Sequence, residues 1–474
     1  MQKFLYLSEL ILFWLVVFLL AFIPLYPKFP LFNVKGTFVA IRLEDLLIGL
    51  TISYWFFYIL ISGKFKAILA DRINQAILLF FLIGAISVVS GLLLTQTVTF
   101  NLGLLHFLRR VEFVLLLPVV ASVIKTKKQL LISLSVLSVV LLAVNIYALG
   151  QQYLRWPVIS TTNSEFSKGL ILYLTPGARV SSTFAGHYDL AIFLAMSLII
   201  LVALFFAFKN LFVKGWIMLL TIFSSVILVM TAARLSFIAA VAGILFALFF
   251  TKKKKYIALL FIIGLAILVY PSQLRDRFIS TVTVNLLDRG ARFMAVNEKQ
   301  AKRQQLNIPT LSTPTSTMAA ESNRFATHSS TLASDITPGE PTDSTELGVF
   351  RSFEIRLNIE WPKALNAFYK NPILGTGYSS LGLASDNDYL RSLGEVGLFG
   401  TIAFALILLA LGKRIYKNLT MEDKFLRYFS AGLLSILLAF LINALFIDVF
   451  EASKAASLFW MLLGTGVAIE KFRK

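Results

Sequence analysis

The feature that most constrains this chain is a series of apolar stretches, each about as long as a membrane is thick. A bilayer core of roughly 30 Å requires about 20 apolar residues in a helix. We identify about twelve such stretches by this criterion, at 9–27, 44–62, 75–94, 103–124, 129–150, 188–208, 214–232, 234–251, 256–271, 394–412, 425–447 and 453–470. The sequence therefore predicts an all-α polytopic membrane protein with about twelve transmembrane helices.

The composition agrees with a membrane protein and excludes several other classes. The chain of 474 residues is 58% hydrophobic and 15% charged, whereas a soluble domain is about 25% charged. This balance excludes a soluble globular enzyme, a disordered protein and a fibrous repeat. Because the chain contains no cysteine, disulfides, thiolate metal sites and cysteine nucleophiles are excluded as well. The three histidines show no metal-ligand spacing.

The distribution of lysine and arginine predicts the orientation. Basic residues gather in alternate short loops, at 64–72, 125–128, 209–214, 252–255 and 413–424, and at both ends of the chain. Cytoplasmic loops are the ones enriched in lysine and arginine. We therefore expect a multi-pass protein of the cytoplasmic (inner) membrane with both termini in the cytoplasm. The net charge of +19 is then explained by the basic cytoplasmic loops, and we expect no nucleic-acid partner. The first apolar stretch lacks a small-residue cleavage site, so we expect it to be retained.

The spacing of the helices predicts three parts. Residues 1–271 would hold helices 1–9 with an outer loop at 151–187, and residues 394–474 would hold helices 10–12. A large extracytoplasmic loop, 272–393, would lie between helices 9 and 10. Within it we predict an amphipathic helix at 272–305, with Leu274, Phe278, Val282 and Leu286 on one face. A second predicted helix covers 351–370. The stretch between them, 307–348, is rich in Ser, Thr and Pro and predicts a flexible insertion.

Three arginines are candidates for binding an anion at the outer face. Arg179 precedes the sixth helix, Arg234 lies between the seventh and eighth, and Arg356 lies on the helix 351–370. A guanidinium presents a planar fork of donors that matches phosphate oxygens. Converging arginines at a membrane surface would suit a lipid-linked pyrophosphate. The alternative for each is an interfacial side chain or a salt-bridge partner.

A second group of candidates follows the helix 351–370. Gly375 and Gly377 permit backbone conformations that other residues avoid. The run Asp386-Asn387-Asp388 precedes the tenth helix, where a carboxylate could accept a proton from an acceptor hydroxyl. Asp and Asn also favour helix N-caps, which is an alternative explanation. A divalent cation held by the two carboxylates is a further one.

These motifs together resemble the O-antigen ligase and O-antigen polymerase-like family of polytopic membrane glycosyltransferases. The family pattern is Arg, then Trp and Ala-Leu, then Pro-x-x-Gly-x-Gly. It continues with His-Asn (or His-Ser or His-Gln), nine residues, and Gly-x-x-Gly. It is matched here in order by Arg356, Trp361, Ala364-Leu365, the segment 372–377, Asn387 and the segment 397–400. Residues 231–236 and 179–184 are similar to two further family segments. The resemblance is firm over about 222–412.

One position departs from the family pattern. The histidine that ligases are thought to use for the acceptor hydroxyl is replaced by Asp386. An aspartate is ordinarily a weaker base than a histidine, so the departure bears on the ligase subtype more than on the family. His187 lies at another junction between a loop and a helix, and no sequence feature places it beside Asp386.

The resemblance implies a reaction and a set of site residues. A glycan would move from a polyprenyl (undecaprenyl) pyrophosphate carrier to an acceptor hydroxyl on the outer membrane face, in polysaccharide biosynthesis for the cell envelope. The expected enzyme inverts the anomeric carbon and needs no metal or other cofactor, since arginines stabilise the leaving pyrophosphate. Asp386 and Arg356 would be catalytic, and Arg179, Arg234 and Arg356 would bind pyrophosphate. Asn387, Tyr389, Gly375 and Gly377 would lie near the acceptor.

The resemblance leaves the acceptor and the subtype open. The acceptor could be a glycan, a lipid or a protein, and membrane lipids would surround the enzyme. A polymerase that joins carrier-linked repeat units is one alternative. A transporter or flippase of lipid-linked glycans is another, although we find no internal repeat with broken helices in matching places.

Overall fold

The computed structural model describes residues 2–34, 40–158, 172–174, 178–283, 353–382 and 384–473. The predicted insertion 307–348, residues 284–305 of the predicted helix 272–305 and part of the loop 151–187 lie outside these residues. The described elements, in chain order, are α1 (Gln2–Leu25), β1 (Pro30–Asn33), β2 (Ala40–Arg42), α2 (Leu43–Ile61), α3 (Phe65–Leu69), α4 (Arg72–Leu93), α5 (Phe100–Val123), α6 (Lys127–Tyr153), α7 (His187–Phe205), α8 (Leu211–Met230), α9 (Arg234–Phe250), η2 (Lys254–Tyr256), α10 (Ile257–Val269), α11 (Gln273–Thr283), η3 (Arg356–Glu360), α15 (Trp361–Lys370), α16 (Asp388–Lys417), η4 (Asn418–Thr420), α17 (Lys424–Asn443), α18 (Ser453–Ile469) and η5 (Glu470–Arg473).

Each predicted apolar stretch coincides with a described helix, but not every helix meets the requirements of a span. Nine helices of the described chain are long and apolar enough to cross a membrane. Three others fall short. α5 contains Arg109, Arg110 and Glu112, α9 has 17 residues, and α10 has 13 residues. A bend of 90° separates α10 from α11. Counting that bent pair as one span gives ten, so the twelve spans that hydropathy predicted are not all established.

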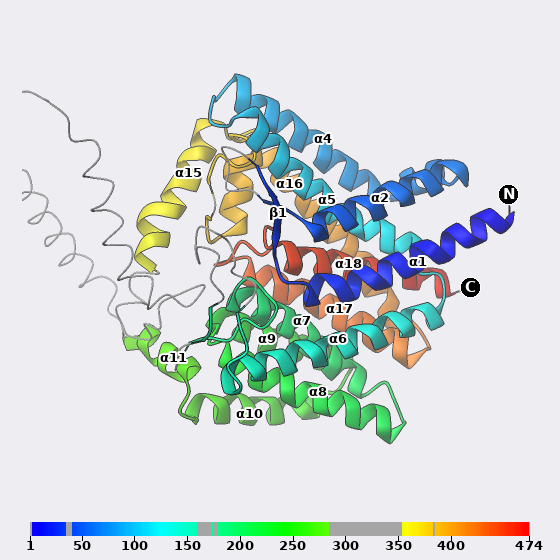
Figure 1. The fold of residues 1–474 in the computed structure, drawn as a ribbon, viewed down its shortest axis with the longest axis vertical. Helices are drawn as coiled ribbons and strands as arrows, with labels where there is room; N and C mark the ends of the chain where they lie inside the picture. Colours follow the sequence, from blue (N-terminus) through cyan, green and yellow to red (C-terminus); the bar gives the residue numbers. More distant parts are fainter. Residues whose placement is uncertain are drawn as a thin grey trace, which may run out of the picture.

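The centre of the bundle is formed by α7, α17 and α18. In these helices 78–83% of the apolar window is buried, against 28% in α8. Figure 1 shows the long helices side by side, with α17 and α18 among the others. α18 packs on α5, and α17 packs on α7 and α9. Small residues permit close approach, as at Gly464, where an added Cβ would lie 2.7 Å from the carbonyl oxygen of Leu117.

The two chain termini lie at the same end of the bundle, which we call the terminal end (Figure 1). Ion pairs join the predicted basic loops there. Glu9 pairs with Lys64 and Lys125, and Arg414 pairs with Asp71. α11 and α15 lie at the opposite end, which we call the far end (Figure 1). The lysine-rich loops therefore share one end with the termini, as their alternation predicted.

A broken helix and a hairpin shape the far end. β1 and β2 pair antiparallel, with Pro30 opposite Arg42, and lead directly into α2. α16 begins at Asp388, six residues before the predicted span, and it is interrupted at Gly397, where φ is +64°. The backbone of Gly397 is non-helical because the segment after α15 inserts beside it. The part of α16 before Gly397 therefore belongs to the far end, and the part after it to the bundle.

Candidate functional site

The first predicted arginine, Arg179, lies in a buried turn before α7. Its Nη1 atom lies 2.7 Å from Nε2 of His187, the first residue of α7. The following turn is fixed from two sides. The Thr183 hydroxyl donates to the carbonyl of Pro24, and the buried ammonium of Lys454 donates to the carbonyls of Tyr26 and Thr183 at 2.7 and 2.8 Å. The end of α1 and Lys454 of α18 thus hold the turn that follows Arg179 in place.

The second predicted arginine, Arg234, is the first residue of α9 and points to α11. Its Nη1 donates to the carbonyl of Arg277 at 3.1 Å and to the hydroxyl of Thr281. Arg277 is itself only 5% exposed. The 90° bend between α10 and α11 brings this amphipathic helix across the end of α9, with Phe278 against Phe237.

The charges of four arginines act on one another at the far end. Arg234 lies in the electrostatic field of Arg277, Arg356 and Arg179. His187 lies in that of Arg179 and Arg277. Arg234 thus contacts the α11 residue Arg277, and the charges of Arg179 and Arg356 reach Arg234 as well. That the predicted arginines share one anion site stays a prediction. We call Arg179, Arg234, Arg277 and Arg356 the arginine cluster. Gathering like charges costs free energy that a bound anion offsets, so the arrangement can bind a multiply charged anion such as pyrophosphate.

Arg356 connects the arginine cluster to Asp386. It lies at the start of η3, a π-helical turn, a type of turn that is frequent at functional sites. Its Nη2 lies 3.0 Å from Oδ2 of Asp386, whose side chain is 36% exposed. Asp386 has φ of +51°, a left-handed conformation that Asp, Asn and His adopt more readily than most residues. The carboxylate thus faces the cluster.

The loop that carries Asp386 is held by the carboxylate of Asp448. The backbone N–H groups of Ser385, Asp386 and Asn387 all donate to Asp448, at 2.7 to 3.2 Å. The Ser385 hydroxyl donates to it as well, and Arg391 pairs with it at 2.7 Å. Successive backbone donors around one carboxylate fix the loop conformation. Asp448 therefore determines where the Asp386 side chain points.

The neighbours of Asp386 have structural contacts. Asn387 is the N-cap of α16, and its side chain accepts a hydrogen bond from Leu390 N at 3.0 Å. Asp388 is buried and accepts from Phe450 N at 3.2 Å. The capping alternative thus describes Asn387, and the two aspartates have different partners and do not converge as a cation site would require. The Tyr389 hydroxyl donates to the carbonyl of Leu441 at 2.8 Å.

Gly375 and Gly377 fasten the segment after α15 to the break in α16. Thr376 N donates to the carbonyl of Gly394, and Gly377 N donates to that of Glu395, each at 2.9 Å. A Cβ at Gly375 would lie 2.4 Å from the Glu395 carbonyl, and φ at Gly375 is +72°. The two glycine motifs that the sequence singled out are therefore two sides of one backbone junction.

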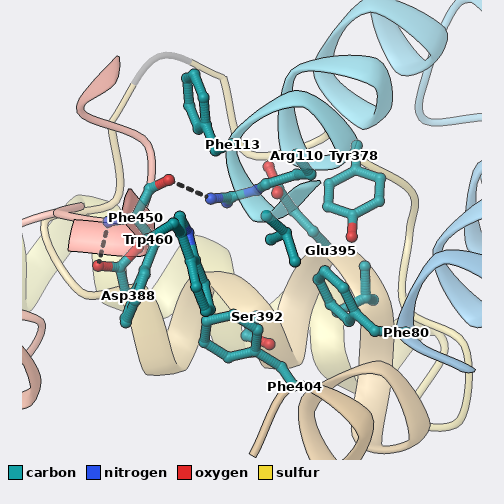
Figure 2. A pocket seen from close by; sticks show the side chains of 12 residues that line it. Phe80, Arg110, Phe113, Tyr378, Asp388, Ser392, Glu395, Phe404, Phe450 and Trp460 are labelled. Carbon is teal, nitrogen blue, oxygen red and sulfur yellow. Dashed lines mark hydrogen bonds between the residues drawn. The ribbon is translucent and has the colours of Figure 1, made fainter. Parts of the chain in front are cut away.

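A buried polar cluster lies beneath this junction (Figure 2). Arg110 donates to the Phe450 carbonyl at 2.7 Å, and Asp388 accepts from the N–H of the same residue. Glu395 and Tyr378 line the same small cavity. Burial raises the pKa of the Tyr378 phenol, which keeps it protonated. Arg110 is one of the charged residues of α5, and its contact with Phe450 supports the far end from inside the bundle.

Sequence reasoning missed Arg277, Arg391 and Asp448. Arg277 stands on a helix with several charges, and such charges usually face water. Arg391 and Asp448 are far apart in sequence, and only the packing of the α17–α18 connection against α16 joins them. An acid at the end of an apolar stretch, as at Asp448, is a usable sequence signal.

The helices and their composition define a multi-pass membrane protein. Residues 219–405 match the family model described as O-Antigen ligase. This match supports an O-antigen ligase-like family, as the motif order indicated. The matched region runs from α8 to α16 and includes Arg234, Arg277, Arg356 and Asp386, whereas Arg179 lies outside it. The family supports an O-antigen ligase- or polymerase-like function in general. A comparison with curated proteins gives no match.

Proposed function

We propose that this protein transfers a glycan from a polyprenyl-pyrophosphate carrier to an acceptor hydroxyl, in the manner of an O-antigen ligase. The observation that carries the proposal is the arginine cluster. Four guanidinium groups from separate elements gather at one end of a membrane protein, inside or next to the ligase-like region. A pyrophosphate would place its negative charge against these guanidinium groups.

The cluster would act on the leaving group. In the proposed reaction the acceptor oxygen attacks the anomeric carbon while the bond from that carbon to the pyrophosphate oxygen breaks, and the configuration inverts. The pyrophosphate takes the electron pair of the broken bond, and preorganised arginines stabilise this developing charge. No metal or other cofactor is required for this role.

Asp386 would take the proton of the acceptor hydroxyl. In the structure its carboxylate is held by Arg356 at 3.0 Å. We infer that Arg356 turns to the pyrophosphate when the carrier binds, which frees Asp386 to accept the proton. The half-exposed side chain and the fixed backbone of the loop suit this exchange. Asn387, Tyr389, Gly375 and Gly377 would then shape the acceptor side through the loop and the junction.

The polyprenyl chain of the carrier requires an apolar groove that starts near the arginines. A groove of about 690 Å³ lies between α6, α8 and α10, and is lined by Val226, Met230 and Ile263 among others. Its lining includes Ala178 and Gln273, which lie next to Arg179 and one helical turn before Arg277. This continuity supports a carrier that enters sideways from the membrane.

The orientation and the number of spans belong to the same proposal. We propose that α5, α9 and α10 lie across the membrane together with the nine longer helices, and that α11 lies at the far end. This gives the twelve crossings of the hydropathy pattern. Both termini and the basic loops would then be cytoplasmic, and the far end would face outward from the inner membrane. The loop 272–393 would form the outer subdomain.

A transfer assay tests the reaction. Purified protein in vesicles is given a polyprenyl-pyrophosphate glycan and a panel of glycan, lipid and peptide acceptors, and the product is measured by mass spectrometry. We expect a new glycosidic bond and released polyprenyl pyrophosphate. Elongated carrier-linked glycan would instead identify a polymerase. Movement of the carrier across the bilayer without any bond formation would identify a flippase and overturn the proposal.

Arg277 provides a matched pair of variants for this assay. Arg277→Gln removes a buried cation of the cluster. Arg275→Gln removes a more exposed cation of the same helix, which pairs with its neighbour Asp276 at 2.8 Å. Removing one donor to a developing charge costs about 10²–10³ in rate. We expect this loss of rate for Arg277→Gln only. An equal loss in both variants would show that the transfer rate depends on the total charge of α11 and not on Arg277 itself.

A further inference from the structure

A second polar cavity lies at the terminal end, away from the arginine cluster. It has a volume of about 560 Å³ and lies between α2, α4, α5 and α18. Four basic side chains line it, those of Lys64, Lys125, Arg414 and Lys471. We call it the basic cavity. No step of the proposed transfer uses these residues.

The basic cavity contains more positive than negative charge. Its acidic lining residues are Asp71 and Glu470, both of which pair with Arg414. Glu9 lies between Lys64 and Lys125 and pairs with both. Three carboxylates thus face four cations. The Lys471 ammonium donates to the Ala121 carbonyl at 2.8 Å.

The surplus cation makes the cavity suited to an anion. Lys471 is repelled by Lys125, Lys64 and Arg414, and among these neighbouring charges Asp71 alone attracts it. A phosphate with one negative charge would balance the surplus and relieve this repulsion. Lysine ammonium groups bind phosphate as point charges with three rotatable donors, so they adapt to a headgroup.

An apolar groove continues from the basic cavity along the bundle. It has a volume of about 610 Å³ and lies between α2, α3, α4 and α5. The groove and the cavity share four lining residues, Ile59, Ile68, Asn74 and Pro118, so they are continuous. Phe56 and Phe57 in the groove are 48% and 56% exposed, which is consistent with contact to lipid.

We propose that the basic cavity and the apolar groove form a binding site for an anionic phospholipid. The phosphate would lie between Lys64, Lys125 and Lys471, and one acyl chain would follow the groove past Phe57. Charge complementarity selects an anionic over a zwitterionic headgroup, since juxtamembrane lysines attract anionic lipids. Because the cavity and the groove share lining residues, one lipid molecule can occupy both, with its headgroup in the cavity and a chain in the groove.

The test compares two lipids with the same acyl chains. Purified protein in mild detergent is titrated with dioleoylphosphatidylglycerol or dioleoylphosphatidylcholine, and bound lipids are counted by native mass spectrometry. We expect the anionic lipid to bind at least tenfold more tightly. Each lysine near an anionic headgroup is worth about fivefold in affinity. The double variant Lys125→Gln/Lys471→Gln should therefore lose most of this preference.

Matched controls separate the site from general surface charge. Lys66→Gln/Lys128→Gln removes two exposed lysines at the same end that do not line the cavity, and it should keep the preference. The single variant Lys125→Gln leaves the hydrogen bond from Lys471 to the Ala121 carbonyl in place. Its affinity for the anionic lipid should fall by about fivefold. Thermal unfolding in phosphatidylcholine checks that each variant is folded.

Three outcomes would overturn the proposal. They are equal binding of the two lipids, an equal loss in the control pair, and binding of sn-glycerol 3-phosphate as tight as that of the whole lipid. The last would indicate a site for a soluble anion. Because the assay measures no glycan transfer, its result is independent of the proposed function.

Discussion

At the scale of single residues, the ion pair between Arg356 and Asp386 joins the two sides of the proposed reaction. Arg356 belongs to the arginine cluster, and Asp386 is carried by a loop that Asp448 fixes. The pair keeps both side chains in place while no substrate is bound. It also implies that each partner has a separate role that substitution can distinguish.

Arg356→Lys tests the bidentate contact with pyrophosphate. Lysine keeps the charge but lacks the planar fork, so we expect turnover to fall by about 10²–10³. The transfer assay measures it. Lys363→Arg is a matched control, since Lys363 lies on the next turns of the same segment and donates to the Leu381 carbonyl. Full turnover in Arg356→Lys would show that a pyrophosphate clamp is not formed by this side chain.

Asp386→Asn tests the proposed base. Asparagine keeps the size of the side chain and its left-handed backbone preference, but it cannot take up a proton at neutral pH. We expect turnover to fall by about 10²-fold or more while the binding of the carrier glycan persists. Asp386→His should recover part of the turnover, because the family pattern has histidine here. Unchanged turnover in Asp386→Asn would show that the residue only holds Arg356.

At the scale of elements, the far end depends on the junction between the Gly375 segment and the broken helix α16. Gly375→Ala would put a Cβ 2.4 Å from the Glu395 carbonyl. Gly382→Ala is its matched control, because φ is also positive there but the nearest atom is the flexible Lys363 Nζ at 3.5 Å. Both changes should cost about 1–2 kcal/mol for the left-handed backbone. Thermal unfolding should show a further loss of stability for Gly375→Ala alone. Equal losses of stability would mean that the backbone of the junction shifts to accommodate the added Cβ.

Asp448→Asn tests whether the α17–α18 connection positions the Asp386 loop. The variant loses the ion pair with Arg391 and part of the acceptor capacity for three N–H groups. A misplacement of about 1 Å can cost 10²-fold in rate, so we expect kcat to fall with little change in KM for the carrier. Asp448→Glu should restore part of it. Asp423→Asn, which removes the charge of the α17 N-cap at the terminal end and its ion pair with Lys127, should leave kcat unchanged.

The elements also show which parts of the fold the sequence predicts. Hydropathy is a local property, and it located the helices because each apolar run is continuous. It did not reveal the break at Gly397, since the break is made by contacts with the inserted Gly375 segment. Among site residues, Arg356 followed from a motif, whereas Arg277 required the 90° bend before α11. Interactions between distant segments, such as Asp448 with Ser385, carry no local pattern.

At the scale of the whole molecule, the two ends of the bundle have different chemistry. The terminal end carries paired lysines and the basic cavity. The far end carries the arginine cluster. The hairpin and α15 lie on the same side of the bundle (Figure 1). A membrane between the two ends would expose one set of charges to each compartment. We propose, from the positive-inside tendency, that the lysine-rich terminal end faces the cytoplasm and the far end faces outward.

Single-cysteine labelling tests this orientation directly, because the chain contains no native cysteine. Tyr369 on α15 is 71% exposed at the far end, and Lys66 is exposed between α2 and α4 at the terminal end. A membrane-impermeant maleimide should label Tyr369→Cys in intact spheroplasts and Lys66→Cys only after lysis. Denatured samples check that both cysteines react equally when accessible. Labelling of Lys66→Cys before lysis would reverse the orientation, and the arginine cluster could then not act on a carrier at the outer face.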